Sequence, residues 1–204
     1  VVVQCCILLE KGQKLFLKGK GTYDWKAVSS TAWRLNLDIE DPVEEFYQDS
    51  VHAFTHIPIY FSGKNKFEVG GDLMSLVDGE WTDSTKMDRG AFMAMFAESA
   101  VADASNLKLP TELSGNCFAY MFYKCEDLEN APELPATDLK RGCYAAMFSG
   151  CKSLEKAPEL PAEKLEFYSY DRMFSNCSNL NYINVSSKDV VQKWVDGVST
   201  TGEF

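Results

Sequence analysis

The sequence predicts an α/β fold, a solenoid of 26-residue coils with short parallel strands and short helices, preceded by an antiparallel β-rich cap. The main observation is a Met-Phe pair that recurs at a constant step of 26 residues. The four pairs are Met95-Phe96, Met121-Phe122, Met147-Phe148 and Met173-Phe174. A fixed period of this length is typical of repeat proteins, in which each unit buries its apolar face only against its neighbours.

Other residue types keep the same step. An aromatic residue stands three positions before each Met, and a leucine or methionine stands eight positions before it. The positions four before and four after each Met hold small residues or cysteine. The same part of two successive repeats, residues 125–139 and 151–165, is nearly identical in sequence. The agreement of these columns is the second observation that predicts stacked coils.

Each Met-Phe pair lies in a segment that we predict to be a short helix. In residues 143–151 the apolar positions fall at i, i+1, i+4, i+5 and i+8, which form one stripe on a helix. Gly150 suits the end of that helix, because glycine adopts a left-handed backbone at little cost. Asn176 can serve at the same column, whereas Lys124 would do so less easily.

The segment after each helix is predicted to be a short strand. Residues 154–157 begin and end on apolar side chains, and the next residue, Pro158, has no amide hydrogen to donate to a sheet. We therefore expect short strands over 128–131, 154–157 and 180–183. Stacked coils would then form a parallel sheet with the helices on its other face.

Five of the seven cysteines lie in two of the repeat columns: Cys117, Cys125, Cys143, Cys151 and Cys177. Buried core positions are the simplest interpretation, since free cysteine behaves as a small hydrophobic residue. Disulfides between stacked coils and a metal site are the alternatives. A zinc site would need about four converging thiolates, usually from C-x-x-C-like pairs, and the cysteines of one repeat are eight residues apart.

The repeat motif C-Y-x-x-M-F-x-x-C-x-x-L-x-x-A-P-x-L-P-A-x-x-L resembles the BspA-like class of leucine-rich repeats, found in surface and secreted proteins of gut and oral anaerobic bacteria. The likeness covers about residues 81–204 and departs from the pattern at Ser99 and Ser169, where cysteine would be usual. It implies a right-handed leucine-rich-repeat solenoid, export, and adhesion to a protein ligand from a host or a bacterium. It implies no catalysis and offers no catalytic residues.

The chain divides into three predicted parts. A β-rich N-terminal segment occupies 1–80, the leucine-rich repeats occupy 81–186, and a C-terminal cap occupies 187–204. A helix near 188–195 would form part of that cap. Both ends of a stack expose apolar surface and unpaired strand groups, so both need covering.

The N-terminal segment lacks the 26-residue step and contains two predicted β-hairpins. Residues 7–9 and 14–18 flank a Gly-containing turn, and residues 57–61 and 66–69 flank another. An antiparallel sheet that caps the array is the simpler interpretation of this segment. An independent β module is the alternative.

His52 and His56 are weak candidates for a metal site, because an i, i+4 pair can share one face of a helix. The sequence lacks the H-E-x-x-H signature, and Pro58 argues that any helix ends there. It also lacks a nucleophile motif, a phosphate-binding glycine motif and a distinctive pair of carboxylates. We therefore predict no enzyme activity, no catalytic residues and no cofactor.

The net charge of −10, without a basic stripe, argues against nucleic acid as a partner, because a phosphate backbone would be repelled. No apolar run in the sequence is long enough to span a bilayer. A signal peptide is not visible, so an extracellular or cell-surface location rests on the family resemblance.

Variable polar side chains beside the predicted strands form the candidate binding surface. They are Glu129, Asn130, Glu133, Glu155, Lys156, Glu159 and Asn181. A protein ligand is the expected partner, although a solvated acidic surface is the simpler interpretation of any single residue. A carbohydrate-binding accessory module is the alternative function, and its glycan would stack on exposed aromatic residues. The candidates for that platform are Trp25, Trp33, Trp81, Tyr123 and Tyr182.

Overall fold

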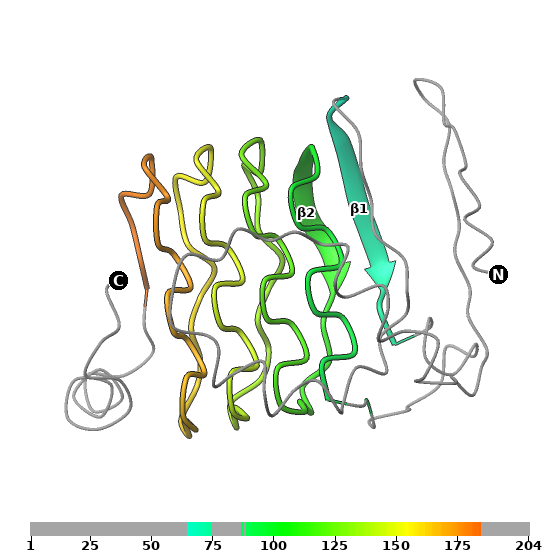
Figure 1. Ribbon diagram of the computed structural model, residues 1–204, viewed down its shortest axis with the longest axis vertical. Coiled ribbons are helices and arrows are strands. Elements are labelled where there is room, and N and C mark those ends of the chain that lie inside the picture. The colour runs from blue at the N-terminus through cyan, green and yellow to red at the C-terminus, as the bar shows by residue number, and fades with distance from the viewer. Residues whose placement is uncertain (1–64, 75–86, 88, 185–204) are drawn as a thin grey trace, which may run out of the picture.

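The computed structural model of the protein describes residues 65–74, 87 and 89–184 (Figure 1). Successive coils lie side by side in chain order, from green through yellow to orange. The predicted hairpin at 7–18, the strand at 57–61 and the helix near 188–195 lie outside the described residues.

Two strands form a parallel pair at the N-terminal side of the described coils. Strand β1 spans Phe67–Asp72 and strand β2 spans Val101–Lys108, with Phe67 opposite Val101 and Asp72 opposite Lys108. The register shifts twice along β1. A strand therefore forms where the sequence predicted one half of an antiparallel hairpin, and its described partner is the parallel β2.

The described residues contain no helix, so the predicted helix over 143–151 is wrong. Four turn ribbons, each an unbroken series of turns, stand in its place in successive coils: residues 89–98, 115–124, 141–150 and 167–176. Every fourth ribbon residue has a positive φ, for example Gly142, Ala146 and Gly150. An α-helix requires negative φ throughout, and these left-handed residues exclude it.

The backbone of each turn ribbon alternates between local and inter-coil hydrogen bonds. The amide of Met121 donates to the Phe118 carbonyl three residues back, with an N···O distance of 3.2 Å. The next amide, of Phe122, donates to the Met147 carbonyl of the following coil at 2.9 Å. The same alternation recurs in the ribbons 89–98 and 141–150. The ribbon 167–176 accepts hydrogen bonds from the preceding coil, and its own described amide bonds are local. The first three ribbons thus satisfy their amides partly within the ribbon and partly across the stack.

A period of four residues explains why these ribbons resemble a helix in the sequence. Cys143, Tyr144, Met147 and Phe148 belong to the main core cluster. The two residues between these pairs, Ala145 and Ala146, belong to a second, smaller cluster with Ala119 and Tyr120. Positions i, i+1, i+4, i+5 and i+8 fit a four-residue period as well as the 3.6-residue period of a helix. Both sides of the ribbon are buried.

The short strands predicted over 128–131, 154–157 and 180–183 are reduced to isolated parallel bridges. Asn130 pairs with Asp103, and Lys156 pairs with Tyr182. The prolines that follow the first two segments have no amide hydrogen, which limits how far a ladder can extend.

Two stacks of aromatic rings run through the main core. The rings of Phe96, Phe122, Phe148 and Phe174 lie parallel, with successive centroids 5.3, 5.6 and 5.8 Å apart. A second stack is built in the same way at the other aromatic column: Phe92, Phe118, Tyr144 and Tyr170. The assignment of the Met-Phe and aromatic columns to a shared interior is confirmed.

Candidate functional site

The seven predicted binding residues are all exposed: Glu129, Asn130, Glu133, Glu155, Lys156, Glu159 and Asn181. They belong to the strand-side segments, residues 126–140 and 152–166, and to the start of the next one. Glu129, Glu155 and Asn181 stand at the same position of successive coils, and the Asn181 amide donates to the Glu155 carbonyl at 3.0 Å. The backbone thus aligns one row of polar side chains.

Hydrogen bonds between side chains order the N-terminal end of this surface. The Asn130 Nδ2 donates to Asp103 Oδ2 at 2.8 Å, and the Ser105 hydroxyl donates to Asp103 Oδ1 at 2.6 Å. The hydrogen bonds from Ser105 hold the pKa of Asp103 below its usual value. This carboxylate therefore stays ionised and keeps three polar side chains in one arrangement.

Lys66 bridges two carboxylates at the same end. Its Nζ lies 3.1 Å from Asp127 Oδ1 and 3.5 Å from Glu129 Oε1. The hydrogen bond with Asp127 is the largest cause that raises the pKa of Lys66. Because all three groups are exposed, water and salt screen this contact, and it contributes little to stability.

Of the predicted aromatic platforms, Tyr182 is exposed and Tyr123 is half-buried. The Nζ atom of Lys156 lies 5.7 Å from the centroid of the Tyr182 ring, within the range of a cation–π contact. Trp25, Trp33 and Trp81 lie outside the described residues.

The described cysteines are free thiols, so the stacked-disulfide alternative does not hold for them. Cys125, Cys151 and Cys177 each donate a hydrogen bond to a phenylalanine carbonyl of the preceding coil, at 2.9 to 3.1 Å. Burial raises the pKa of Cys125 to about 11 and that of Cys143 to about 12. Such thiols are protonated near neutral pH and are poor nucleophiles.

Ser99 takes the place of cysteine directly after the first described ribbon. Its hydroxyl donates to the Phe96 carbonyl at 2.7 Å, and the Cys125 thiol donates to the same carbonyl. Ser99 thus bonds within its own coil, whereas Cys125 bonds to the preceding coil, and the two side chains share one acceptor.

Metal and membrane sites find no support within the part of the chain that the structure describes. No group of three or more His, Cys, Asp or Glu residues lies close enough there to hold a metal ion. Among the same residues, no helix has the length and apolar character needed to cross a bilayer. His52 and His56 lie outside the described residues.

Sequence reasoning missed one surface feature, an open pocket around Arg89, Gly115 and Arg141. These residues stand at one position of three successive coils. The signal that could have revealed it is a glycine between two arginines in a repeat column.

Comparisons with protein-family models, with curated proteins and with solved structures find no match to this chain.

Proposed function

We propose that the protein is an exported, non-enzymatic binding scaffold that recognises a protein partner at the cell surface. In this proposal the coils form a right-handed leucine-rich-repeat solenoid, and its strand-side row is the contact surface. The observation that carries the proposal is the exposed row of Glu129, Glu155 and Asn181 on a backbone fixed by hydrogen bonds between coils. A preorganised row loses little conformational entropy when a partner binds.

The chemistry of the buried groups supports a binding role over an enzymatic one. The raised pKa values of Cys125 and Cys143 keep these thiols protonated. Buried, protonated thiols fit a structural core, whereas a catalytic cysteine needs a lowered pKa and access to substrate. We therefore assign the strand-side row, which is acidic, a role in binding through complementary charge.

A binding screen with charge-reversed variants tests the proposal. The full chain would be screened against immobilised matrix proteins and surface proteins, and then with Glu129→Lys and Glu155→Lys combined. We expect saturable binding to a protein that the double variant loses, because reversal of two charges opposes a basic partner. Glu163→Lys, an exposed carboxylate outside the row, is the matched control and should bind normally.

Equal binding by the double variant and the wild type would remove the strand-side row from the proposal. Binding that also survives high salt would argue against charge recognition as a whole.

A carbohydrate-binding module is the second candidate function, and the exposed Tyr182 with Lys156 beside its ring favours it. Aromatic faces commonly stack against sugar rings. Saturable binding on a glycan array that Tyr182→Ala abolishes, and that Phe167→Ala leaves intact, would select this function over protein recognition. Phe167 is a suitable control because it is another exposed aromatic residue.

A further inference from the structure

The Nε atom of Arg89 is buried and has no hydrogen-bond partner. A buried donor without an acceptor is costly, and such atoms in folded proteins call for an explanation. Gly115 stands beside it, and a Cβ atom there would lie 3.4 Å from Arg89 Nε and 3.5 Å from Arg89 Cγ. The absence of a side chain at Gly115 therefore leaves space beside the Arg89 side chain.

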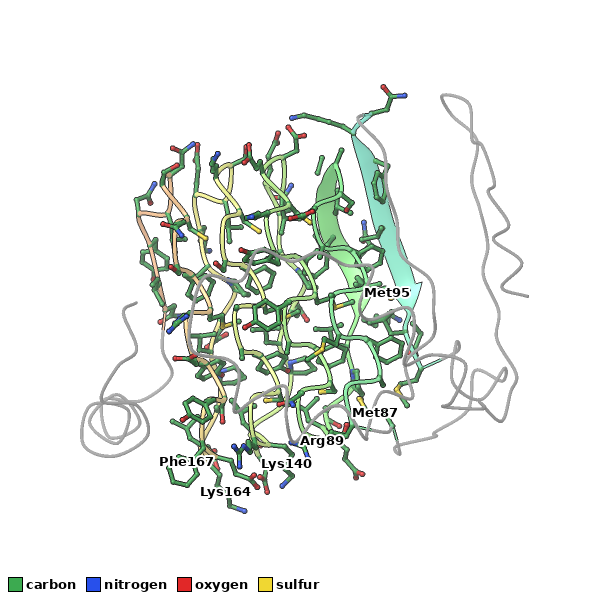
Figure 2. All side chains as sticks on the ribbon, in the orientation of Figure 1. Met87, Arg89, Met95, Lys140, Lys164 and Phe167 are labelled. Carbon is green, nitrogen blue, oxygen red and sulfur yellow. The ribbon has the colours of Figure 1, made fainter. Side chains whose placement is uncertain are left out.

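The space is part of an open pocket of about 370 Å³. Arg89, Gly115 and Arg141 occupy one repeat column, so two arginines flank the gap in that column. Lys140 and Glu166 line it too, which gives three positive side chains against one negative. Figure 2 shows Arg89, Lys140 and Lys164 along one edge of the coils. A local excess of positive charge stands out in a chain of net charge −10.

The other charged groups of the pocket already have partners. Lys140 Nζ lies 2.9 Å from Asp138 Oδ1, and the Arg141 guanidinium lies 5.9 Å from the Tyr168 ring centroid. The Glu166 Oε2 accepts the backbone amide of Arg141 at 3.1 Å. Glu166 is thus held near the pocket by the backbone and leaves Arg89 Nε without an acceptor.

We propose that this pocket binds a carboxylate group, with Arg89 as its main donor and Arg141 as a second positive charge. A carboxylate is planar, and its two oxygens match the fork of a guanidinium group. It carries a single negative charge, so repulsion by Glu166 weighs less on it than on a doubly charged phosphate. The carboxylate belongs either to a free small acid or to an acidic side chain or C-terminus of a peptide.

This site lies apart from the strand-side row, so the carboxylate proposal can fail or succeed independently of the proposed function. Arg89, Gly115 and Arg141 are not members of that row, and small carboxylates test the pocket without any protein partner.

Nuclear magnetic resonance of the arginine Nε–H groups tests the proposal directly. The full chain, labelled with ¹⁵N-arginine, would be titrated with sodium acetate against sodium chloride at equal ionic strength. The Arg89 Nε–H signal, assigned through Arg89→Lys, should shift in a saturable way with acetate only. An unchanged signal, or the same shift with chloride, would overturn the proposal. So would an acetate response confined to other arginines such as Arg172.

Two variants sharpen this test without removing an arginine. Gly115→Ala places a methyl group beside Arg89 Nε and should weaken acetate binding severalfold, although every charge is kept. Glu166→Gln removes the repelling charge, keeps an acceptor for the Arg141 amide, and should tighten acetate binding about twofold to threefold. Glu155→Gln, an equal charge change on the strand-side row, is the control. Weakening by Glu166→Gln, or no effect of Gly115→Ala, would contradict the assigned geometry.

A pair of short peptides then identifies the source of the carboxylate. One carries an aspartate with blocked termini, and the other carries a free C-terminus without acidic side chains. Saturation of the Arg89 signal by either peptide extends the site to protein ligands of that kind. Binding of acetate alone assigns the site to small free acids.

Discussion

The turn ribbons and the strand-side segments of the same coils differ sharply in how they are buried and bonded. In the ribbon 141–150, nine of ten residues are buried, whereas in the strand-side segment 152–166 only four of fifteen are. From the ribbon 115–124, five amides donate to the next coil, at every second position. The longer strand-side segments 126–140 and 152–166 exchange four such bonds, near their two ends.

This difference separates the two tasks of a coil. The ribbon carries the ring stacks, the carbonyls that accept the thiol hydrogen bonds, and most of the inter-coil backbone bonds, so it supplies cohesion. The strand-side segment contributes a few leucine and alanine side chains to the core and leaves the rest exposed. Substitutions at its exposed positions should change the free energy of unfolding little, as is usual for surface residues.

The largest expected contrast comes from one substitution on each side. Met147→Asp buries an unpaired charge at a fully buried position and should abolish cooperative folding. Glu155→Ala, at an exposed position, should change the free energy of unfolding by less than about 0.5 kcal/mol. Urea denaturation followed by circular dichroism measures both. If Met147→Asp left the free energy of unfolding unchanged, the ribbon would not be the part that holds the coils together.

Alkaline pH should weaken the contacts between coils through the buried thiols that follow the ribbons. The unfolded Cys125 thiol titrates at 9.0, and burial raises its pKa in the folded protein to about 11. Its stabilising effect is therefore complete below pH 9 and is lost as pH rises from 9 toward 11, at up to about 1.4 kcal/mol per pH unit.

Denaturation curves at several pH values measure this loss, and Cys125→Ser should reduce its slope. Serine is a suitable replacement because its hydroxyl can donate to the Phe96 carbonyl but does not ionise in this pH range. A slope in the variant equal to that of the wild type would assign the alkaline loss to other groups.

Left-handed backbone in the ribbon gives smaller and unequal losses of stability at two positions of one column. Gly150 has a φ of 80°, and a Cβ there would lie 3.3 Å from Lys124 Cα, so Gly150→Ala should cost about 1–2 kcal/mol. Lys124 has a φ of 54°, and Lys124→Gly should cost less than about 0.5 kcal/mol because relief of strain offsets its lost contacts. Thermal unfolding measures the stability of both variants. Equal losses of stability in Gly150→Ala and Lys124→Gly would argue against the left-handed turn geometry.

The smallest effect concerns a hydroxyl group in the aromatic stack. The Tyr144 hydroxyl is buried without a hydrogen-bond partner, and the ring stacks between Phe118 and Tyr170. Tyr144→Phe should therefore raise the free energy of unfolding by about 1 kcal/mol. Tyr182→Phe, at an exposed ring, should leave it unchanged. A loss of stability in Tyr144→Phe would show that its hydroxyl has an acceptor.

The sequence revealed the step of the coils and their core columns, because burial repeats wherever identical coils stack. It failed on the ribbon conformation, since nine residues cannot separate a period of four from one of 3.6. Gly150 and Asn176 did signal a left-handed backbone, but Ala146 and Tyr120 gave no such sign. The strand-side row was predictable as surface, whereas the pocket at Arg89 depends on contacts between three coils.

Cohesion between the coils depends on alternate ribbon amides that hydrogen-bond across the stack. Scalar couplings through hydrogen bonds between ¹⁵N amides and ¹³C carbonyls measure this directly. The amide of Phe122 should couple to the carbonyl of Met147, as the 2.9 Å contact requires. Coupling of that amide to the Phe118 carbonyl, four residues back, would identify a helix and contradict the account.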